Sequence, residues 1–263
     1  MELQLRGRSA FVSGSTQGIG YAIASALAAE GVRVIVNGRD AARVEAAVEQ
    51  LRREHPGSEP SGLVADFGSP EQVGRLLEAL GDVDILVNNV GLFGLAPFED
   101  VDDDEWARYL EVNVMSGVRL SRHLLGGMLD RGWGRILFIS SESGVNVPAD
   151  MVHYGVTKAA MLALANGLAK RTRGTTVTVN AILGGPTYSD GVAATVEAIA
   201  EAQSLPAEAM KQAIIGQNGT TLLERFIEPR EIANLATYLA SPVASATNGA
   251  ALRADGGVLT GML

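Results

Sequence analysis

FVSGSTQGIG, residues 11–20, is the stretch that decides the fold of this chain. A short apolar run, Ala10–Val12, stops at Ser13, and after Gly20 a helix rich in small residues runs to Gly31. A strand that enters a helix through a glycine-rich turn suits phosphate binding, because the backbone can approach the anion and the helix N-terminus presents free N–H groups. The glycines fall in the spacing G-x-x-x-G-x-G. The structural alternative is a turn that only packs a strand against a helix. The rest of the chain has to distinguish this alternative from phosphate binding.

The composition bounds what this turn can belong to. With 263 residues, of which 47% are hydrophobic and 19% charged, the chain suits one globular domain over residues 1–263. Its net charge of −9 argues against nucleic acid or an anionic membrane as the main partner, because both attract basic surfaces. The absence of cysteine excludes disulfides and thiolate chemistry. The N-terminus has no signal-peptide core and no stretch reaches about 18 apolar residues, so we expect a cytoplasmic protein.

Short apolar runs alternate with helical patterns along the chain. Such runs, each followed by a helix, are typical of a parallel sheet that is covered on both faces. We therefore predict an α/β fold, a doubly wound (Rossmann-type) parallel sheet of about seven strands. The expected strands are 10–12, 32–36, 62–65, 84–87, 135–140, 176–183 and 250–253. The expected helices are 21–30, 41–54, 70–80, one long helix over 106–130, 154–171 and 229–240.

One insertion breaks this alternation. Residues 184–223 contain two helical patches, 193–203 and 207–215, and insertions of this kind are more often lids or binding loops than packing elements. The lid is rich in alanine, isoleucine and valine, which favours an uncharged substrate or the apolar part of a carrier-bound one. We expect its pocket to be walled by Phe93, Leu95, Met151 and Tyr188.

Three polar residues near the end of the strand 135–140 could carry chemistry. Tyr154 and Lys158 lie one helical turn apart, so that the phenol and the ammonium can address the same volume. Ser141 can return to the same place, although a lone Tyr-x-x-x-Lys is more often structural. The phenol can exchange a proton with a carbonyl or alcohol oxygen, and we expect the ammonium and a nicotinamide to lower its pKa. No metal is needed, and His55, His123 and His153 lack ligand spacing.

Five motifs in order resemble the short-chain dehydrogenase/reductase family, in particular its oxoacyl-carrier-protein-reductase-like ketoreductases. They are SGSTQGIG, NNVG after the fourth strand, Asn113, ISSESG and YGVTK, with VNAILGGPTYS and LRADGG extending the likeness to nearly the whole chain. The resemblance implies an oxidoreductase that moves hydride between a nicotinamide cofactor and a carbonyl or secondary alcohol.

The resemblance also implies roles for individual residues. The catalytic group would be Ser141, Tyr154 and Lys158, with Asn113 supporting a water-linked proton path from the lysine. The cofactor would lie against Gly14, Ser15, Thr16, Gln17, Gly18, Ile19, Gly20, Asp66, Phe67, Asn88, Val90, Gly91, Gly185, Pro186 and Thr187, besides Tyr154 and Lys158. Two positions depart from the family pattern. Val90 replaces an alanine and adds bulk beside the cofactor, and Gly184 replaces a proline and is expected to loosen the hinge of the lid.

The end of the second strand predicts which cofactor is used. Enzymes selective for NAD place an acidic residue there, and in this chain the position is Gly38, followed by Arg39. Gly38 leaves room for a 2′-phosphate and Arg39 can bind it, so we expect NADP(H) to be preferred, with NAD(H) possible. Asp40 either caps the next helix, which we favour, or reaches the ribose and restores NAD use. The glycine turn carries no second basic residue, so the selectivity should be moderate.

The assembly and the role have alternatives at this stage. Long helices rich in small residues, and the resemblance, favour a homotetramer over a dimer. A non-catalytic dinucleotide-binding sensor that kept the fold is the second reading of the function, because a fold alone does not establish activity. The natural small-molecule substrate and the direction of the reaction stay open.

Overall fold

A seven-stranded parallel sheet forms the centre of the computed structural model, which describes residues 2–217 and 221–262. The strands lie in the order β3-β2-β1-β4-β5-β6-β7. Successive strands are added outward on one side of β1 up to β3, and from β4 onward they are added on its other side. The doubly wound parallel fold predicted from the alternating pattern is confirmed. The strands are β1 (Ser9–Val12), β2 (Arg33–Gly38), β3 (Ser61–Val64), β4 (Ile85–Asn88), β5 (Arg135–Ser141), β6 (Thr178–Gly184) and β7 (Ala251–Ala254).

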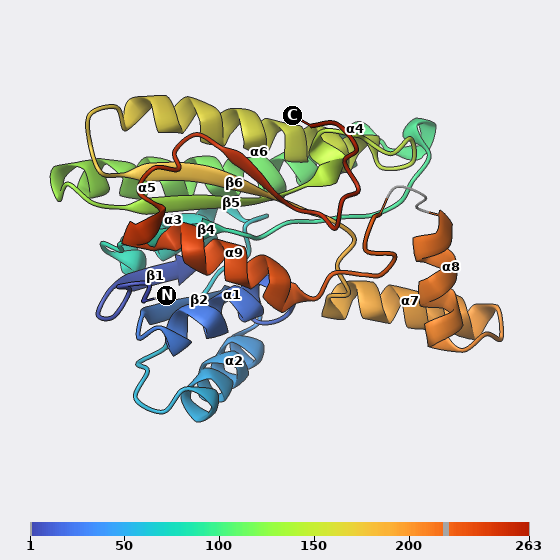
Figure 1. The fold of residues 1–263 in the computed structure, drawn as a ribbon, viewed down its shortest axis with the longest axis horizontal. Helices are drawn as coiled ribbons and strands as arrows, with labels where there is room; N and C mark the ends of the chain where they lie inside the picture. The colour runs from blue at the N-terminus through green and yellow to red at the C-terminus, as the bar shows by residue number, and fades with distance from the viewer. Residues whose placement is uncertain (1, 218–220, 263) are drawn as a thin grey trace.

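Helices cover both faces of this sheet (Figure 1). One face carries α1 (Gly18–Ala29), α2 (Ala41–Glu54) and α9 (Pro229–Ala240). The other carries α3 (Pro70–Leu80), α5 (Ser116–Asp130) and α6 (Val152–Arg171), with α4 (Asp103–Tyr109) against α6. Short 3₁₀ helices are η1 (Phe98–Asp100), η3 (Glu142–Gly144) and η4 (Pro242–Ala244).

The central strands β1, β2, β4, β5 and β6 are largely apolar because each one contributes side chains to two cores. Along β1, Ala10 and Val12 enter the core under α1 and α9, whereas Phe11 enters the core under α3 and α5. In β5, Ile136 and Phe138 point to this second core. Successive side chains on a strand point to opposite faces, so a sheet covered twice needs an unbroken apolar run. None of the helices in the described chain combines the length and the apolarity that a membrane span requires.

The predicted single helix over 106–130 is wrong in one respect. The structure has α4, then a π-helical turn η2 (Leu110–Met115), then α5. The acidic run 102–105 forms the start of α4, where Asp102 accepts a hydrogen bond from the Glu105 N–H at 2.8 Å and caps the helix. Apolar periodicity does not distinguish an α-helix from one that contains an inserted π-turn, and such turns are frequent at functional sites.

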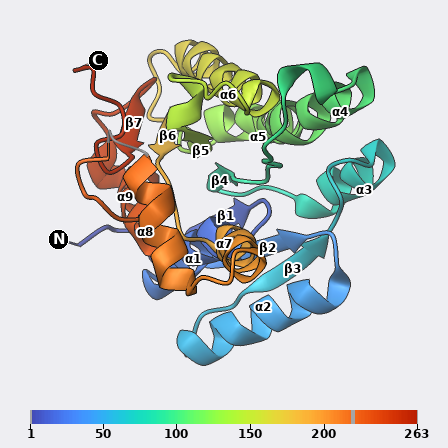
Figure 2. The same cartoon turned by 90° about the vertical axis from the view of Figure 1, so that its right-hand side faces the viewer.

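The insertion forms α7 (Asp190–Ala202) and α8 (Ala207–Gln217), which Figures 1 and 2 show beyond the end of the sheet. Val196, Ala200 and Met210 make a small core of their own between these two helices. The chain enters this segment from the carboxyl end of β6, so α7 and α8 stand next to the edge where the strands end. Residues 218–220 of the predicted lid lie outside the described part of the chain.

Candidate active site

The glycine turn is tied to the end of β2. The Gly14 N–H donates to Asn37 Oδ1 at 3.0 Å, and the Asn37 N–H donates to Ser15 Oγ at 3.0 Å. Gly14 and Gly18 have φ angles of 61° and 60°, a left-handed conformation that favours glycine. Ser15 is fully buried beneath the turn, so of the predicted cofactor residues it supports the backbone and faces no cavity.

The turn also folds tightly onto α1. A Cβ atom at Gly20 would lie 2.4 Å from the Gly14 carbonyl oxygen, so no larger residue fits in this backbone. The Asn89 side chain completes the turn, since its Nδ2 donates to the carbonyl oxygens of Ser13 and Gly14 at 3.0 and 2.9 Å. Both asparagines belong to the NNVG motif, and Asn89 is the one that holds the turn. The Asn88 amide points away, toward Ser121 at 3.4 Å.

Two basic residues that sequence reasoning missed share a cavity with Arg39. This Arg39 cavity, of about 440 Å³, holds Arg43 from α2 and Arg108 from α4. Asp40 caps α2 by accepting from the Arg43 N–H at 2.9 Å, as favoured above, and this bond commits one of its carboxylate oxygens to the helix. The predicted cofactor residues that line the Arg39 cavity are Gly14, Thr16, Gln17, Asp66, Phe67, Val90 and Gly91. The glycine spacing could not reveal Arg43 and Arg108, because they reach the cavity from helices.

Gly38 lines the Arg39 cavity, and it has a second role beside the glycine turn. A Cβ atom there would lie 2.6 Å from Thr16 Cγ2, so the space beside Gly38 is taken by the glycine turn itself. The missing side chain therefore lets Thr16 pack against the end of β2. A carboxylate at position 38 could not be accommodated without moving Thr16.

A second cavity, of about 320 Å³, is lined by Tyr154 and Lys158. This Tyr154 cavity lies at the carboxyl ends of β5 and β6, next to α7. Its walls include Phe93 and Met151, two of the four predicted substrate residues. Leu95, 67% exposed, and Tyr188, which packs on Phe226 with ring centroids 5.6 Å apart, do not line it. The predicted cofactor residues Ile19, Gly185, Pro186 and Thr187 complete the wall.

Lys158 is held at the back of this cavity. It is 5% exposed, its Nζ donates to the Ile139 carbonyl at 2.9 Å, and it lies 5.5 Å from the centroid of the Tyr154 ring. The Ser140 hydroxyl donates to the Lys158 carbonyl at 2.9 Å, which joins α6 to β5. Ser141, the last residue of β5, accepts from the Ser143 N–H at 3.1 Å. The structure thus gathers all three residues at one strand end, as the motif spacing implied.

Burial sets the protonation of the pair. It raises the pKa of Tyr154 to about 12, against a lowering by the Ser141 hydroxyl and a further raising by Glu142. Burial also lowers the pKa of Lys158 to about 8. Burial is the largest cause of the raised pKa of Tyr154 in the protein alone, because a phenolate removed from water is disfavoured. The lowering expected from the ammonium together with a bound nicotinamide stays a prediction.

Asn113 is fixed inside the π-turn. Its Oδ1 accepts from the Leu92 N–H at 2.7 Å, and its Nδ2 donates to the Leu92 carbonyl and to Thr157 Oγ1 at 3.0 and 2.9 Å. A Cβ atom on Gly91 would lie 3.5 Å from Asn113 Oδ1 and 3.6 Å from Lys158 Nζ. Asn113 thus positions the loop after β4 and Thr157, the residue that precedes Lys158.

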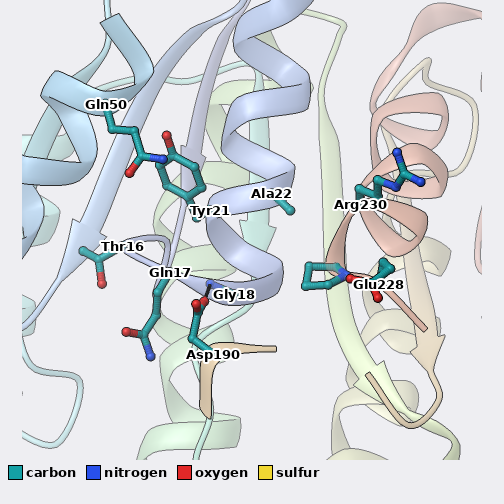
Figure 3. A pocket seen from close by; sticks show the side chains of 10 residues that line it. Thr16, Gln17, Gly18, Tyr21, Ala22, Gln50, Asp190, Glu228 and Arg230 are labelled. Atoms are coloured by element: carbon teal, nitrogen blue, oxygen red, sulfur yellow. Dashed lines mark hydrogen bonds between the residues drawn. The ribbon is translucent and has the colours of Figure 1, made fainter. Parts of the chain in front are cut away.

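The α7–α8 segment contacts the glycine turn directly. Asp190, the first residue of α7, accepts a hydrogen bond from the Gly18 N–H at 2.6 Å. Figure 3 shows this carboxylate against Gly18, in a further cavity of about 400 Å³ that also contains Tyr21, Glu228 and Arg230. The N-terminus of α1 carries a partial positive charge, so an acidic side chain is stabilised there.

Gly184 is held between two strands. It pairs with Ser141 of β5 and Ala254 of β7, and the Gly185 N–H donates to the Ala254 carbonyl at 3.1 Å. A Cβ atom at Gly185 would lie 2.4 Å from the Asp255 carbonyl. The loosening expected at Gly184 is therefore opposed by the sheet, and the next residues are held as well, because the Ile227 N–H donates to the Pro186 carbonyl at 2.8 Å.

The histidines give no sign of a metal centre. His153 is buried against Tyr109, with ring centroids 4.4 Å apart and nearly perpendicular planes. Among residues 2–217 and 221–262, no group of three or more His, Asp or Glu side chains could hold a metal ion.

Comparisons with known proteins identify relatives along the whole chain. The family model described as short chain dehydrogenase matches residues 8–200. The uncharacterized oxidoreductase YvaG of Bacillus subtilis (strain 168) is 42% identical over 260 residues, 98% of each chain. A 3-oxoacyl-(acyl-carrier-protein) reductase, FabG, of Aquifex aeolicus is 31% identical over 98% of this chain and 100% of its own. The crystal structure of L-sorbose reductase from Gluconobacter frateurii, complexed with NADPH and L-sorbose, matches with a TM-score of 0.94 and 30% identity over 100% of both chains.

Proposed function

This chain belongs to the short-chain dehydrogenase family, and we propose that it is an NADP(H)-preferring oxidoreductase acting on a carbonyl or secondary alcohol substrate. The observation that carries the proposal is the meeting of Ser141, Tyr154 and Lys158 at the carboxyl end of β5, where two of them line one cavity. A sensor that only bound the cofactor would have no need of a buried phenol beside a buried ammonium.

Each residue of the site has its own role in the proposed reaction. A bound nicotinamide supplies or accepts the hydride. The Tyr154 hydroxyl gives a proton to the carbonyl oxygen in reduction and takes it back in oxidation. The Ser141 hydroxyl holds the same oxygen, and Lys158 presents its charge to the phenol from the back of the cavity. Asn113 keeps this arrangement by fixing Leu92 and Thr157.

The glycine turn fits a dinucleotide. The Gly18 N–H lies at the N-terminus of α1, where the partial positive charge suits a diphosphate, which would take the place of the Asp190 carboxylate. The Arg39 cavity suits an adenosine moiety, with Asp66, Phe67 and Val90 as its walls. Arg39 and Arg43 supply two cations at the edge of this cavity, which supports NADP(H) over NAD(H). The structural neighbour L-sorbose reductase is complexed with NADPH.

The test is a turnover assay. Purified protein should oxidise NADPH with at least one member of a panel of ketones, aldehydes and β-ketoacyl thioesters, and the Ser141→Ala variant should lose this turnover. The panel should include a ketose and acyl thioesters, because the relatives of this chain include L-sorbose reductase and a 3-oxoacyl-(acyl-carrier-protein) reductase. NADPH binding without turnover across the panel would favour the sensor.

The proposed assembly is a homotetramer, with a dimer as the alternative. Leu110 and Val156, on the η2 and α6 side of the molecule, are 40% and 41% exposed, and Gly167 on α6 has open space beside it. Small and apolar residues on long helices permit close helix packing between subunits. A stable monomer in sedimentation at micromolar concentration would overturn the proposal.

A further inference from the structure

Glu142 places an acidic side chain on the wall of the Tyr154 cavity. It follows Ser141 directly, as the first residue of η3, and it lines the cavity together with Tyr154 and Lys158. Glu142 and Lys158 are the charged residues of this lining, and Lys158 Nζ donates to the Ile139 carbonyl. The acid thus faces the space in which the reacting group would lie.

The carboxylate has no cationic partner in the described chain. None of the ion pairs among residues 2–217 and 221–262 includes Glu142. Its contacts are with hydroxyl groups, and Ser141 Oγ lies 3.3 Å from Glu142 Oε2. Asp255 adds negative charge nearby, and its two oxygens accept from the Gly257 and Leu259 N–H groups at 3.0 and 3.1 Å.

A carboxylate in this position retains capacity for further hydrogen bonds. Two carboxylate oxygens offer about four acceptor sites, and the neighbouring serines use a part of them. Burial raises the pKa of Glu142, which reflects the cost of holding the charge away from water, and Asp255 raises it further. A ligand that brought a hydrogen-bond donor into the cavity would offset this cost, whereas an anionic ligand would add to it.

We propose that Glu142 accepts a hydrogen bond from a hydroxyl or ammonium group that the substrate carries on the carbon next to its carbonyl carbon. The inference rests on the proposed function, because it takes the carbonyl oxygen to lie at Ser141 and Tyr154. Since Glu142 Oε2 is 3.3 Å from Ser141 Oγ, a donor that it reaches belongs one carbon away from the carbonyl carbon. The substrate class is therefore hydroxy ketones and amino ketones, and keto acids are disfavoured. Hydroxy ketones fall within the uncharged substrates expected from the lid composition, whereas amino ketones add a cationic group to that expectation.

The test compares four small carbonyl compounds of similar size: hydroxyacetone, aminoacetone, butanone and pyruvate. In the wild type, kcat/KM for hydroxyacetone and for aminoacetone should each exceed that for butanone at least about tenfold, since an unpaired buried acceptor is expensive. Pyruvate should be the poorest. Glu142→Leu should bring hydroxyacetone and aminoacetone down to the level of butanone, while butanone itself changes less than about threefold.

Glu142→Gln separates the two kinds of donor. Its amide oxygen still accepts from a hydroxyl, so hydroxyacetone should lose less than with leucine, whereas the advantage of the cationic aminoacetone should vanish. The same exchange at Glu78, an exposed residue of α3, is the matched control and should change nothing. NADPH affinity, measured by fluorescence for each variant, shows whether the fold is kept.

The outcomes distinguish this inference from the proposed function. Equal losses with hydroxyacetone and butanone in both Glu142 variants would show that Glu142 only supports the structure. A wild-type preference for butanone or pyruvate would overturn the inference and leave the oxidoreductase standing. Failure of the wild type to turn over any carbonyl compound, despite binding NADPH, would overturn both.

Discussion

The Asp190 carboxylate accepts a hydrogen bond from the Gly18 N–H at 2.6 Å, and this contact joins the first residue of α7 to the N-terminus of α1. Both partners lie where the resemblance puts a diphosphate. The Asp190 carboxylate thus occupies the N–H group that we expect to bind the cofactor diphosphate. The α7–α8 segment and the cofactor would therefore compete for this N–H group.

Asp190→Asn should strengthen NADPH binding several-fold, because it removes a like charge next to the diphosphate while keeping a side chain of the same shape. Fluorescence titration measures the dissociation constant. Asp130→Asn, at the exposed end of α5, is the control and should leave affinity unchanged. Weaker NADPH binding by the Asp190 variant would contradict a competition between Asp190 and the diphosphate for the Gly18 N–H. It would show instead that the carboxylate helps to hold the cofactor.

Tyr154→Phe should lower kcat at least about a hundredfold, because only the transferable proton is lost and general acid catalysis contributes that much. NADPH affinity should stay nearly the same, since the ring still packs. Tyr238→Phe on α9, outside both the Tyr154 and Arg39 cavities, serves as the matched control. Retention of more than about a tenth of the wild-type kcat would remove Tyr154 from its role.

Lys158→Met should change how stability depends on pH. Burial lowers the pKa of Lys158 to about 8 from its usual 10.5, so between these values the unfolded chain binds one more proton than the folded chain. The Lys158 contribution therefore makes the unfolding free energy rise as pH increases from 8 to 10.5. Denaturant titrations should find that the stability of the methionine variant relative to wild type falls over this interval. A difference that stays constant with pH would mean that Lys158 has an ordinary pKa.

Arg39→Ala should weaken NADPH binding at least tenfold, on the order of one charged hydrogen bond, and NADH binding less than about threefold. Arg43→Ala should act in the same direction with a smaller effect, because Arg43 also lines the Arg39 cavity. Arg53→Ala, on the same helix but away from the cavity, should have no effect. Equal losses for the two cofactors, or a wild type that prefers NADH, would show that Arg39 does not bind the 2′-phosphate.

The sequence by itself determined the fold and the residues that meet at the candidate site. Strand, glycine turn and helix are local patterns, because apolar runs and glycine spacing act within a few residues. The parallel sheet then follows from the alternation, and parallel strands bring their carboxyl ends to one edge. That edge gathered Ser141, Tyr154 and Lys158 without further information.

Only the tertiary structure decided what surrounds them. Arg108 and Asp190 reach their sites from helices far along the chain, and no local pattern encodes such contacts. The π-turn at Asn113 keeps the apolar periodicity of a helix, so the sequence could not disclose it. The raised pKa values of Tyr154 and Glu142 depend on how much water and counter-charge the packed chain leaves beside them. Desolvation is a property of the whole fold, and therefore the electrostatics of this site could not be read before its walls were in place.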